Sequence, residues 1–374
     1  MHRTICDRMS VIIVCAALMA AGSCESGEPG VTTDSMYQEI EAMVWDGDYS
    51  GGQWEPDWDD AAFYGTAFYS RTGWEENRED YKQRAVESVQ RYTTIARTCL
   101  DGMTDVFLEN MTEVLYGTLG AIDYMVASGD ETPLPTVDEV IDKADLMSQV
   151  LTGNYFEGFT NYAMDTYGPT TVTAMLAVVN LQYAVLLDTP RKQERIESAR
   201  AIISKIDEKA WNGSYYLFAP DRPDYLDLYP NIVMMITLAR MNQATGEAVF
   251  LERAESIYSA IEPLRCPGRP GYKSLYSAEA MGAQTDDYTT LSATNYAIFA
   301  FALLAQITGK AVYRNEIETQ LDFIKNYVYV PADRTAYHHW MDGRLALPTD
   351  LEYYCIGCNL QLIYIIWWVR HYLA

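Results

Sequence analysis

A short helix-breaking motif recurs along this chain of 374 residues. Four of its five occurrences end in Gly, which terminates helices readily because it can adopt a left-handed backbone conformation. Successive breaks lie 56, 60, 57 and 63 residues apart, and such a period indicates repeated structural units. The five breaks are Thr72-Gly73, Ser128-Gly129, Asp188-Thr189-Pro190, Thr245-Gly246 and Thr308-Gly309.

Each break separates two helical patterns of different character. The segment before a break is rich in apolar residues and poor in charge, which is typical of a helix buried on most sides. The segment after it is charged on one face and apolar on the other. Buried helices are predicted near 57–72, 108–128, 169–187, 229–244, 288–307 and 354–373, and exposed helices near 77–98, 136–151, 191–209, 247–262 and 310–327. The amphipathic stretch 35–45 could pair with the last buried helix and close a ring.

This alternation of buried helix, tight turn and amphipathic helix resembles an (α/α)6 toroid. Three sequence segments support the resemblance: Ala239-Arg-Met-Asn-Gln-Ala-Thr-Gly246, Leu304-Ala-Gln-Ile-Thr-Gly-Lys-Ala-Val-Tyr313 and Trp211-Asn-Gly-Ser-Tyr-Tyr216. The chain looks like the six-hairpin glycosidases and their relatives, which include sugar epimerases and polysaccharide lyases. The resemblance implies an all-α fold, a single toroid domain over 34–374, and an active site in a funnel on one rim. An open helical solenoid is the alternative.

The N-terminus has the pattern of an export signal. Arg3 and Arg8 precede a short apolar core at 11–20, and small residues lead to Cys24. The ending resembles a bacterial lipobox, which implies a signal peptide over 1–23, a lipid on Cys24 and a flexible tether over 24–33. We therefore expect a lipid-anchored protein of the bacterial cell envelope, with the membrane contacted through the lipid alone. Ordinary secretion and an uncleaved anchor are the alternatives.

The charge balance excludes a large class of partners. Asp and Glu number 52 against 27 Lys and Arg, which gives a net charge of −25, so the chain would repel a nucleic-acid backbone. Disorder is also excluded, because 49% of residues are hydrophobic and 13% aromatic. Acidic residues that are not interspersed with Lys and Arg fall in loops such as 57–60 and 342–352. This distribution predicts a negative charge at the mouth of the funnel, and therefore a neutral or cationic glycan as ligand. Arg265, Arg269 and Lys273 are the residues that could overturn this expectation.

In a toroid, the long loops that precede the buried helices emerge on one rim. These loops, near 99–107, 152–168, 209–228, 263–287 and 328–353, also concentrate polar and aromatic residues. The first candidate group opens the first buried helix, where Asp59 and Asp60 follow Trp54 and Trp58. The helix dipole by itself favours acidic residues there, so helix capping is the competing interpretation.

A second group, Asp286, Asp287 and Tyr288, leads into the fifth buried helix, and Tyr272 lies in the same loop. Adjacent carboxylates shift each other's pKa, which is one way to keep a proton donor near neutral pH. The competing interpretation is a helix cap with a solvated neighbour.

A third group, His338, His339 and Trp340, precedes the last helix together with Glu352. Histidine suits acid/base catalysis. A metal is not expected, because adjacent histidines seldom point at one ion.

Further loop residues are candidates for sugar contact. Asp165 precedes the third buried helix, and Tyr155 and Trp211 add aromatic faces of the kind that cover a pyranose ring. Packing between helices is the competing interpretation of the many tyrosines. Asn residues recur early in three buried helices, at 231, 295 and 359, where they either cross-link neighbouring helix starts or bind sugar hydroxyls.

Four cysteines follow the export signal: Cys99, Cys266, Cys355 and Cys358. An even number in an exported protein suggests disulfides. The toroid resemblance puts all four near the funnel in consecutive hairpins, so Cys266 could pair with Cys355 or Cys358, and Cys99 with the other. Unpaired thiols and a four-thiolate zinc site are the alternatives.

These observations favour a carbohydrate-active protein, most of all a glycoside hydrolase. One carboxylic acid would protonate the leaving oxygen and a second would activate water or attack, with one acid from Asp59 or Asp60 and one from Asp286 or Asp287. A non-catalytic glycan- or partner-binding lipoprotein is the main alternative, and an epimerase or lyase is a further one.

The segment 57–60 also resembles the acid motif of class II terpene cyclases, which is a less favoured alternative. We expect no cofactor and no metal.

Overall fold

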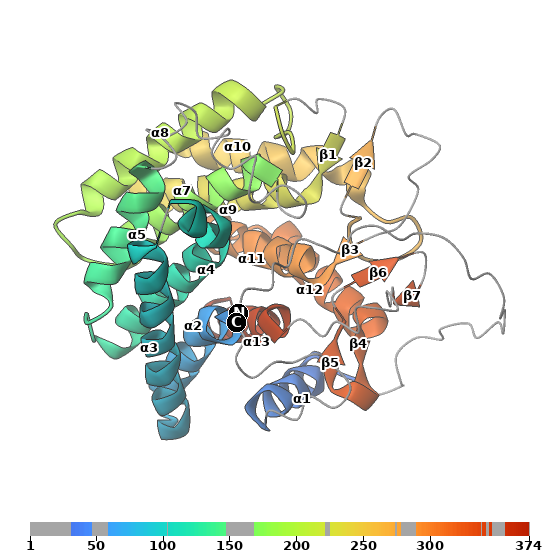
Figure 1. Cartoon of the computed structure of the whole chain (residues 1–374). Helices are drawn as coiled ribbons and strands as arrows, with labels where there is room; N and C mark the ends of the chain where they lie inside the picture. Colours follow the sequence, from blue (N-terminus) through green and yellow to red (C-terminus); the bar gives the residue numbers. More distant parts are fainter. Residues whose placement is uncertain are drawn as a thin grey trace.

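The computed structural model describes residues 31–46, 59–102, 104–146, 168–220, 225–273, 275–277, 289–337, 339–341, 344–345 and 356–373. This part of the chain contains twelve α-helices and a few very short strands. Six helices form an inner ring, and the other six lie outside it (Figure 1).

The inner helices are the ones predicted to be buried on most sides. They are α2 (Asp59–Glu75), α4 (Thr104–Ser128), α7 (Gly168–Leu186), α9 (Leu228–Thr245), α11 (Leu291–Thr308) and α13 (Ile356–Tyr372). Each packs against the next in this order, and α13 packs against α2, so the ring is closed. The predicted (α/α)6 toroid is confirmed, and the open solenoid is wrong.

The outer helices are α3 (Glu79–Asp101), α5 (Leu134–Leu146), α8 (Lys192–Ala210), α10 (Ala248–Ala260), α12 (Ala311–Phe323) and α1 (Thr33–Asp46). Their apolar residues recur at helical spacing, as in α3, where Tyr81, Ala85, Val89 and Tyr92 are buried. Helix α1 packs against α13 and supplies the missing sixth outer helix, as the sequence predicted.

Helix α11 is long and apolar enough to cross a membrane by length and composition, and 72% of this segment is buried inside the protein. Its position in the inner ring explains its apolar character.

Short antiparallel strands lie before the inner helices α9, α11 and α13. The pairs are β1 (Tyr225–Asp227) with β2 (Leu275–Ser277), β3 (Thr289–Thr290) with β6 (His339–Met341), β6 with β7 (Arg344–Leu345), and β4 (Tyr329–Val330) with β5 (Thr335–Ala336). The pairs β1–β2 and β3–β6 each join the connections of two neighbouring hairpins. We call this side of the ring the rim, and the opposite side, where short turns follow the inner helices, the closed end.

The recurring breaks have two different structural roles. Gly129, Gly246 and Gly309 have φ values of +73°, +74° and +69° and follow the ends of α4, α9 and α11, as expected of helix-ending glycines. Gly73 is different, because it lies inside the last turns of α2. A Cβ on Gly73 would come within 2.8 Å of the backbone N of Lys82 in α3. This glycine therefore permits close helix packing rather than a turn.

Candidate functional site

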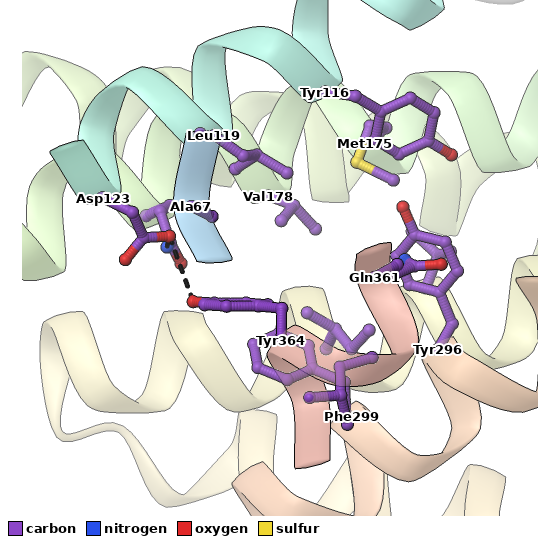
Figure 2. Close-up of a pocket in the computed structure, with 15 residues that line it drawn as sticks. Ala67, Tyr116, Leu119, Asp123, Met175, Val178, Tyr296, Phe299, Gln361 and Tyr364 are labelled. Atoms are coloured by element: carbon purple, nitrogen blue, oxygen red, sulfur yellow. Dashed lines mark hydrogen bonds between the residues drawn. The ribbon is translucent and has the colours of Figure 1, made fainter. Parts of the chain in front are cut away.

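A cavity of about 80 Å³ lies on the axis of the ring. Every inner helix contributes to its wall, so the cavity is a product of ring closure (Figure 2). Its polar and aromatic lining includes Tyr116 and Asp123 from α4, Gln182 from α7, Tyr296 and Phe299 from α11, and Gln361 and Tyr364 from α13.

The end of the cavity toward the rim is lined by tyrosines and amides. The rings of Tyr116 and Tyr296 have centroids 6.1 Å apart, and Tyr229 lies 5.5 Å from Tyr296. The Tyr229 hydroxyl shares a hydrogen bond of 2.7 Å with Ser292 Oγ. Flat rings combined with polar edges are suited to the apolar faces and hydroxyl groups of a sugar.

At the opposite end, the carboxylate of Asp123 is the centre of a buried hydrogen-bond network. Arg71 donates from Nε and Nη2 to Asp123 Oδ1 at 2.9 and 2.6 Å. Tyr364 donates to Oδ2 at 3.1 Å (Figure 2). Gln182 donates to the same oxygen at 3.4 Å. Burial and the nearby Asp123 charge raise the pKa of Tyr364 well above its ordinary value, so its hydroxyl stays a donor.

A second buried arginine extends this network toward α9. Arg240 is 5% exposed, and it donates from Nη1 to Gln243 at 2.8 Å. Burial lowers the pKa of Arg240, while Asp123 and Tyr364 act in the opposite direction. We call Arg71, Asp123, Gln182, Arg240 and Tyr364 the axial plug, because they fill the ring axis between the cavity and the closed end.

Our sequence reasoning missed the axial plug, although a signal for it exists. Arg240 is the single charged residue of segment 229–244, and Arg71 and Asp123 each follow an uncharged run, 61–70 and 114–122, within an apolar segment. Charged side chains are almost never fully buried unless they are paired. A charge in each of several helices predicted to share a ring therefore indicates a buried ionic contact on its axis.

The predicted rim residues are only partly covered by the structure. Asp59 and Asp60 open α2, and His339 and Trp340 lie in β6; the description of these four is limited to the backbone. Nine further candidates lie outside the described residues: Trp54, Trp58, Tyr155, Asp165, Asp286, Asp287, Tyr288, His338 and Glu352.

Strand pairing nevertheless places the backbone of one predicted group beside the start of α11. In the β3–β6 pair, Thr290 is opposite His339 and Thr289 is opposite Trp340. Thr290 is also the N-cap of α11, and its side chain accepts from the backbone N of Ala293. The His339-Trp340 backbone thus lies beside the start of the inner helix that Asp286 and Asp287 precede in sequence.

Trp211 and Tyr272, two of the predicted substrate contacts, both pack against neighbouring side chains. Trp211 lies 4.7 Å from the ring of Tyr216, with the Arg253 guanidinium 5.1 Å from its own ring. Tyr272 is 2% exposed and donates to Glu316 Oε2 at 3.3 Å. Neither ring lines the cavity. Packing, the competing interpretation of the aromatic residues, describes both.

The recurring asparagines tie the starts of α9, α11 and α13 to neighbouring backbone: Asn295 links two helix starts, and the other two bond to connecting segments. Asn231 accepts from the backbone N of Tyr216 at 2.8 Å and donates to its carbonyl at 2.9 Å. Asn359 accepts from the backbone N of Ala336 at 2.9 Å and donates to its carbonyl at 3.0 Å. Asn295 donates to the carbonyl of Cys358 at 2.8 Å. All three are fully buried, so the sugar-binding interpretation of these residues is wrong.

A carboxyl at the rim has an altered acidity. Asp227 precedes α9 and accepts from the backbone N of Tyr229 at 2.8 Å. Burial raises the pKa of Asp227 to about 7, although this backbone hydrogen bond favours the charged form.

The cysteine predictions are only partly covered by the structure. Cys99, Cys266 and Cys358 are buried, and Cys355 lies outside the described residues. Disulfide pairing among the four stays a prediction.

No family model and no curated protein matches this chain. Solved structures share its fold at low identity. A sugar epimerase from a ruminal bacterium has a TM-score of 0.67 at 10% identity, over 90% of this chain and 98% of its own. Cellobiose 2-epimerase from Bacillus thermoamylovorans has a TM-score of 0.61 at 12% identity, over 89% and 98%. A GH76 α-mannanase of Bacteroides thetaiotaomicron has 0.61 at 11% identity, over 90% and 95%. These neighbours are carbohydrate-active enzymes, and what this chain shares with them is the (α/α)6 fold.

Proposed function

We propose that this protein binds a carbohydrate at the rim end of the axial cavity and hydrolyses a glycosidic bond there. The observation that carries the proposal is the cavity, which places tyrosine rings and amide groups on the axis of a closed toroid. A site built from side chains on six packed helices is held more precisely than one built on loops. Such a site suits a ligand with alternating apolar faces and hydroxyl groups.

In this proposal, the carboxyl groups come from the rim. Asp59 or Asp60 at the start of α2 and Asp286 or Asp287 before β3 supply the acid and its partner. One protonates the leaving oxygen, and the other activates water or attacks the sugar. The pairing of β3 with β6 supports this arrangement, since it brings the backbone of a second predicted rim group to the start of α11. The excess of acidic residues favours a neutral or cationic glycan.

The proposal extends to location. The lipobox-like ending at Cys24 favours a lipid anchor in the bacterial cell envelope, and the glycan would be met outside the cytoplasm.

A glycan panel tests the activity. The wild-type protein is incubated with neutral and cationic oligosaccharides, and products are followed by release of reducing ends and by NMR. We expect hydrolysis of at least one glycan and a loss of about 10³-fold or more in Asp287→Asn, whose glycan binding persists. Asp80→Asn, an exposed change at the start of α3, is the matched control and should keep full activity.

Three results would contradict hydrolysis. Epimerised or unsaturated products would show an epimerase or a lyase instead. Saturable binding without turnover would favour a non-catalytic glycan-binding protein. Absence of both binding and turnover across the panel would remove the carbohydrate proposal altogether.

A further inference from the structure

We propose that the axial cavity is a blind pocket for the terminal sugar of a glycan, so that the protein recognises chain ends rather than chain interiors. This inference rests on the proposed function and narrows its substrate class. It follows from what closes the cavity, from the size of the cavity, and from the polar groups that line its two ends.

The axial plug closes the cavity on the side away from the rim. Arg71 from α2 and Tyr364 from α13 both bond to Asp123 from α4, and Gln182 from α7 reaches the same carboxylate. Figure 2 shows the Asp123–Tyr364 bond at one end of the lining residues. A buried ion pair such as Arg71–Asp123 is costly to open, because separating its partners leaves a buried charge without its counter-charge.

Further contacts continue this closure toward the closed end. Arg240 bonds to Gln243, and Gln243 donates to Gln306 at 3.3 Å, which joins α9 to α11. Tyr372 donates to Glu75 at 3.2 Å, which joins α13 to α2. Buried or half-buried side chains of α2, α4, α7, α9 and α13 thus close the axis, whereas the contact from α11 is exposed. We infer that a ligand enters from the rim.

The size of the cavity corresponds to one sugar ring. An ordered water needs about 10–15 Å³ of such space, so the cavity of 80 Å³ holds about 5–8 water molecules. This volume suits one sugar ring and is far too small for a chain of sugars. An internal sugar carries two neighbours, and both would have to leave through the same mouth. A terminal sugar carries one, so it alone enters a blind pocket without folding the glycan back on itself.

The lining offers unused hydrogen-bonding groups at both ends. Gln361 accepts from Asn295 Nδ2 at 3.3 Å, and within the described residues its Nε2 group has no partner. Gln182 uses its Nε2 on Asp123, and its Oε1 has no partner in that same part of the chain. An amide donor toward the rim and an amide acceptor at the plug can therefore bind hydroxyls on two sides of one sugar.

The experiment uses the glycan that the panel identifies, prepared in four forms: unmodified, blocked at the non-reducing end, blocked at the reducing end, and cyclic or blocked at both ends. Binding is measured by calorimetry and turnover by product analysis. We expect the forms without free ends to lose at least about 100-fold in affinity and turnover, and one singly blocked form to behave like the unmodified glycan.

The outcomes separate this inference from the proposed function. Equal binding of the unmodified and doubly blocked glycans would overturn chain-end recognition and leave the carbohydrate function standing. Failure to bind any form would overturn both.

A pair of variants tests the location of the bound sugar. Gln361→Ala should weaken binding of the unmodified glycan about tenfold, the loss of one net hydrogen bond. Gln90→Ala changes the same residue type at an exposed position of the outer helix α3 and should bind normally. Unchanged binding in Gln361→Ala, with thermal stability like the wild type, would place the sugar elsewhere.

Discussion

At the scale of single residues, Asp123 is the buried charge on which the ring axis depends most. Its carboxylate accepts from Arg71, Tyr364 and Gln182, and its side chain is 4% exposed. Burial acts to lower the pKa of Arg71, but the charge and hydrogen bonds of Asp123 raise it overall, so the guanidinium stays charged inside the protein. The presence of such a buried pair adds little to the free energy of unfolding, but removal of one partner lowers that free energy strongly.

We predict that Asp123→Asn lowers the free energy of unfolding by about 3–5 kcal/mol, because the buried Arg71 would lose its charged partner and keep only the contact with Glu75. Urea denaturation followed by circular dichroism measures the change. Lys205→Met, which breaks an exposed ion pair on α8, is the control and should leave stability unchanged within error. A loss in Asp123→Asn no larger than in the control would show that the axial plug does not hold the ring together.

At the scale of elements, the glycines show what local sequence can and cannot predict. Gly309 ends α11 at a φ of +69°, and nothing lies within 4 Å of a Cβ placed there. Gly73 occupies the equivalent position in the sequence repeat but is helical and packs against the backbone of α3. The Thr-Gly motif is identical in both places. The difference lies in how closely the neighbouring helix approaches.

This difference predicts unequal costs for the same substitution. Gly309→Ala should cost about 1–2 kcal/mol of stability, from placing a Cβ in the left-handed region. Gly73→Ala should cost more despite the better helix propensity of Ala, because its Cβ would lie 2.8 Å from Lys82 N and the helices would have to separate. Thermal denaturation of the two variants compares them, and a Gly73→Ala protein as stable as the wild type would refute the packing role.

At the scale of the whole molecule, closure of the ring depends on contacts between the two ends of the sequence. Helix α1 packs against α13, and Asp34 is paired with Arg370. Glu41 accepts from Arg78 at 2.6 Å, which ties α1 to the start of α3 as well. Ile40 is fully buried in the core. Helix α1 is therefore an integral part of the toroid and not an appendage.

We predict that Ile40→Ala lowers the stability of the entire domain by about 2–5 kcal/mol, the cost of a cavity in a packed core. The midpoint of the single unfolding transition should move, and hydrogen exchange should increase in α13 as well as in α1. Gln38→Ala, at an exposed position of α1, is the control. Faster exchange confined to α1, with an unchanged midpoint, would mean that the other helices hold the ring closed without it.

The sequence by itself determined the helices and their inner or outer position, because hydrophobic periodicity and helix-ending residues are local signals. It also determined that the Asn residues lie at helix starts. It left open whether the helices form a closed ring or an open solenoid, which the packing of α13 against α2 decided. Only the tertiary structure decided that Asp123 meets Arg71, that Tyr272 is a packing residue, and that His339 lies opposite Thr290. These contacts join residues 44 or more positions apart, and no local pattern encodes such distances. The cavity belongs to the same class, since it exists only where six helices meet.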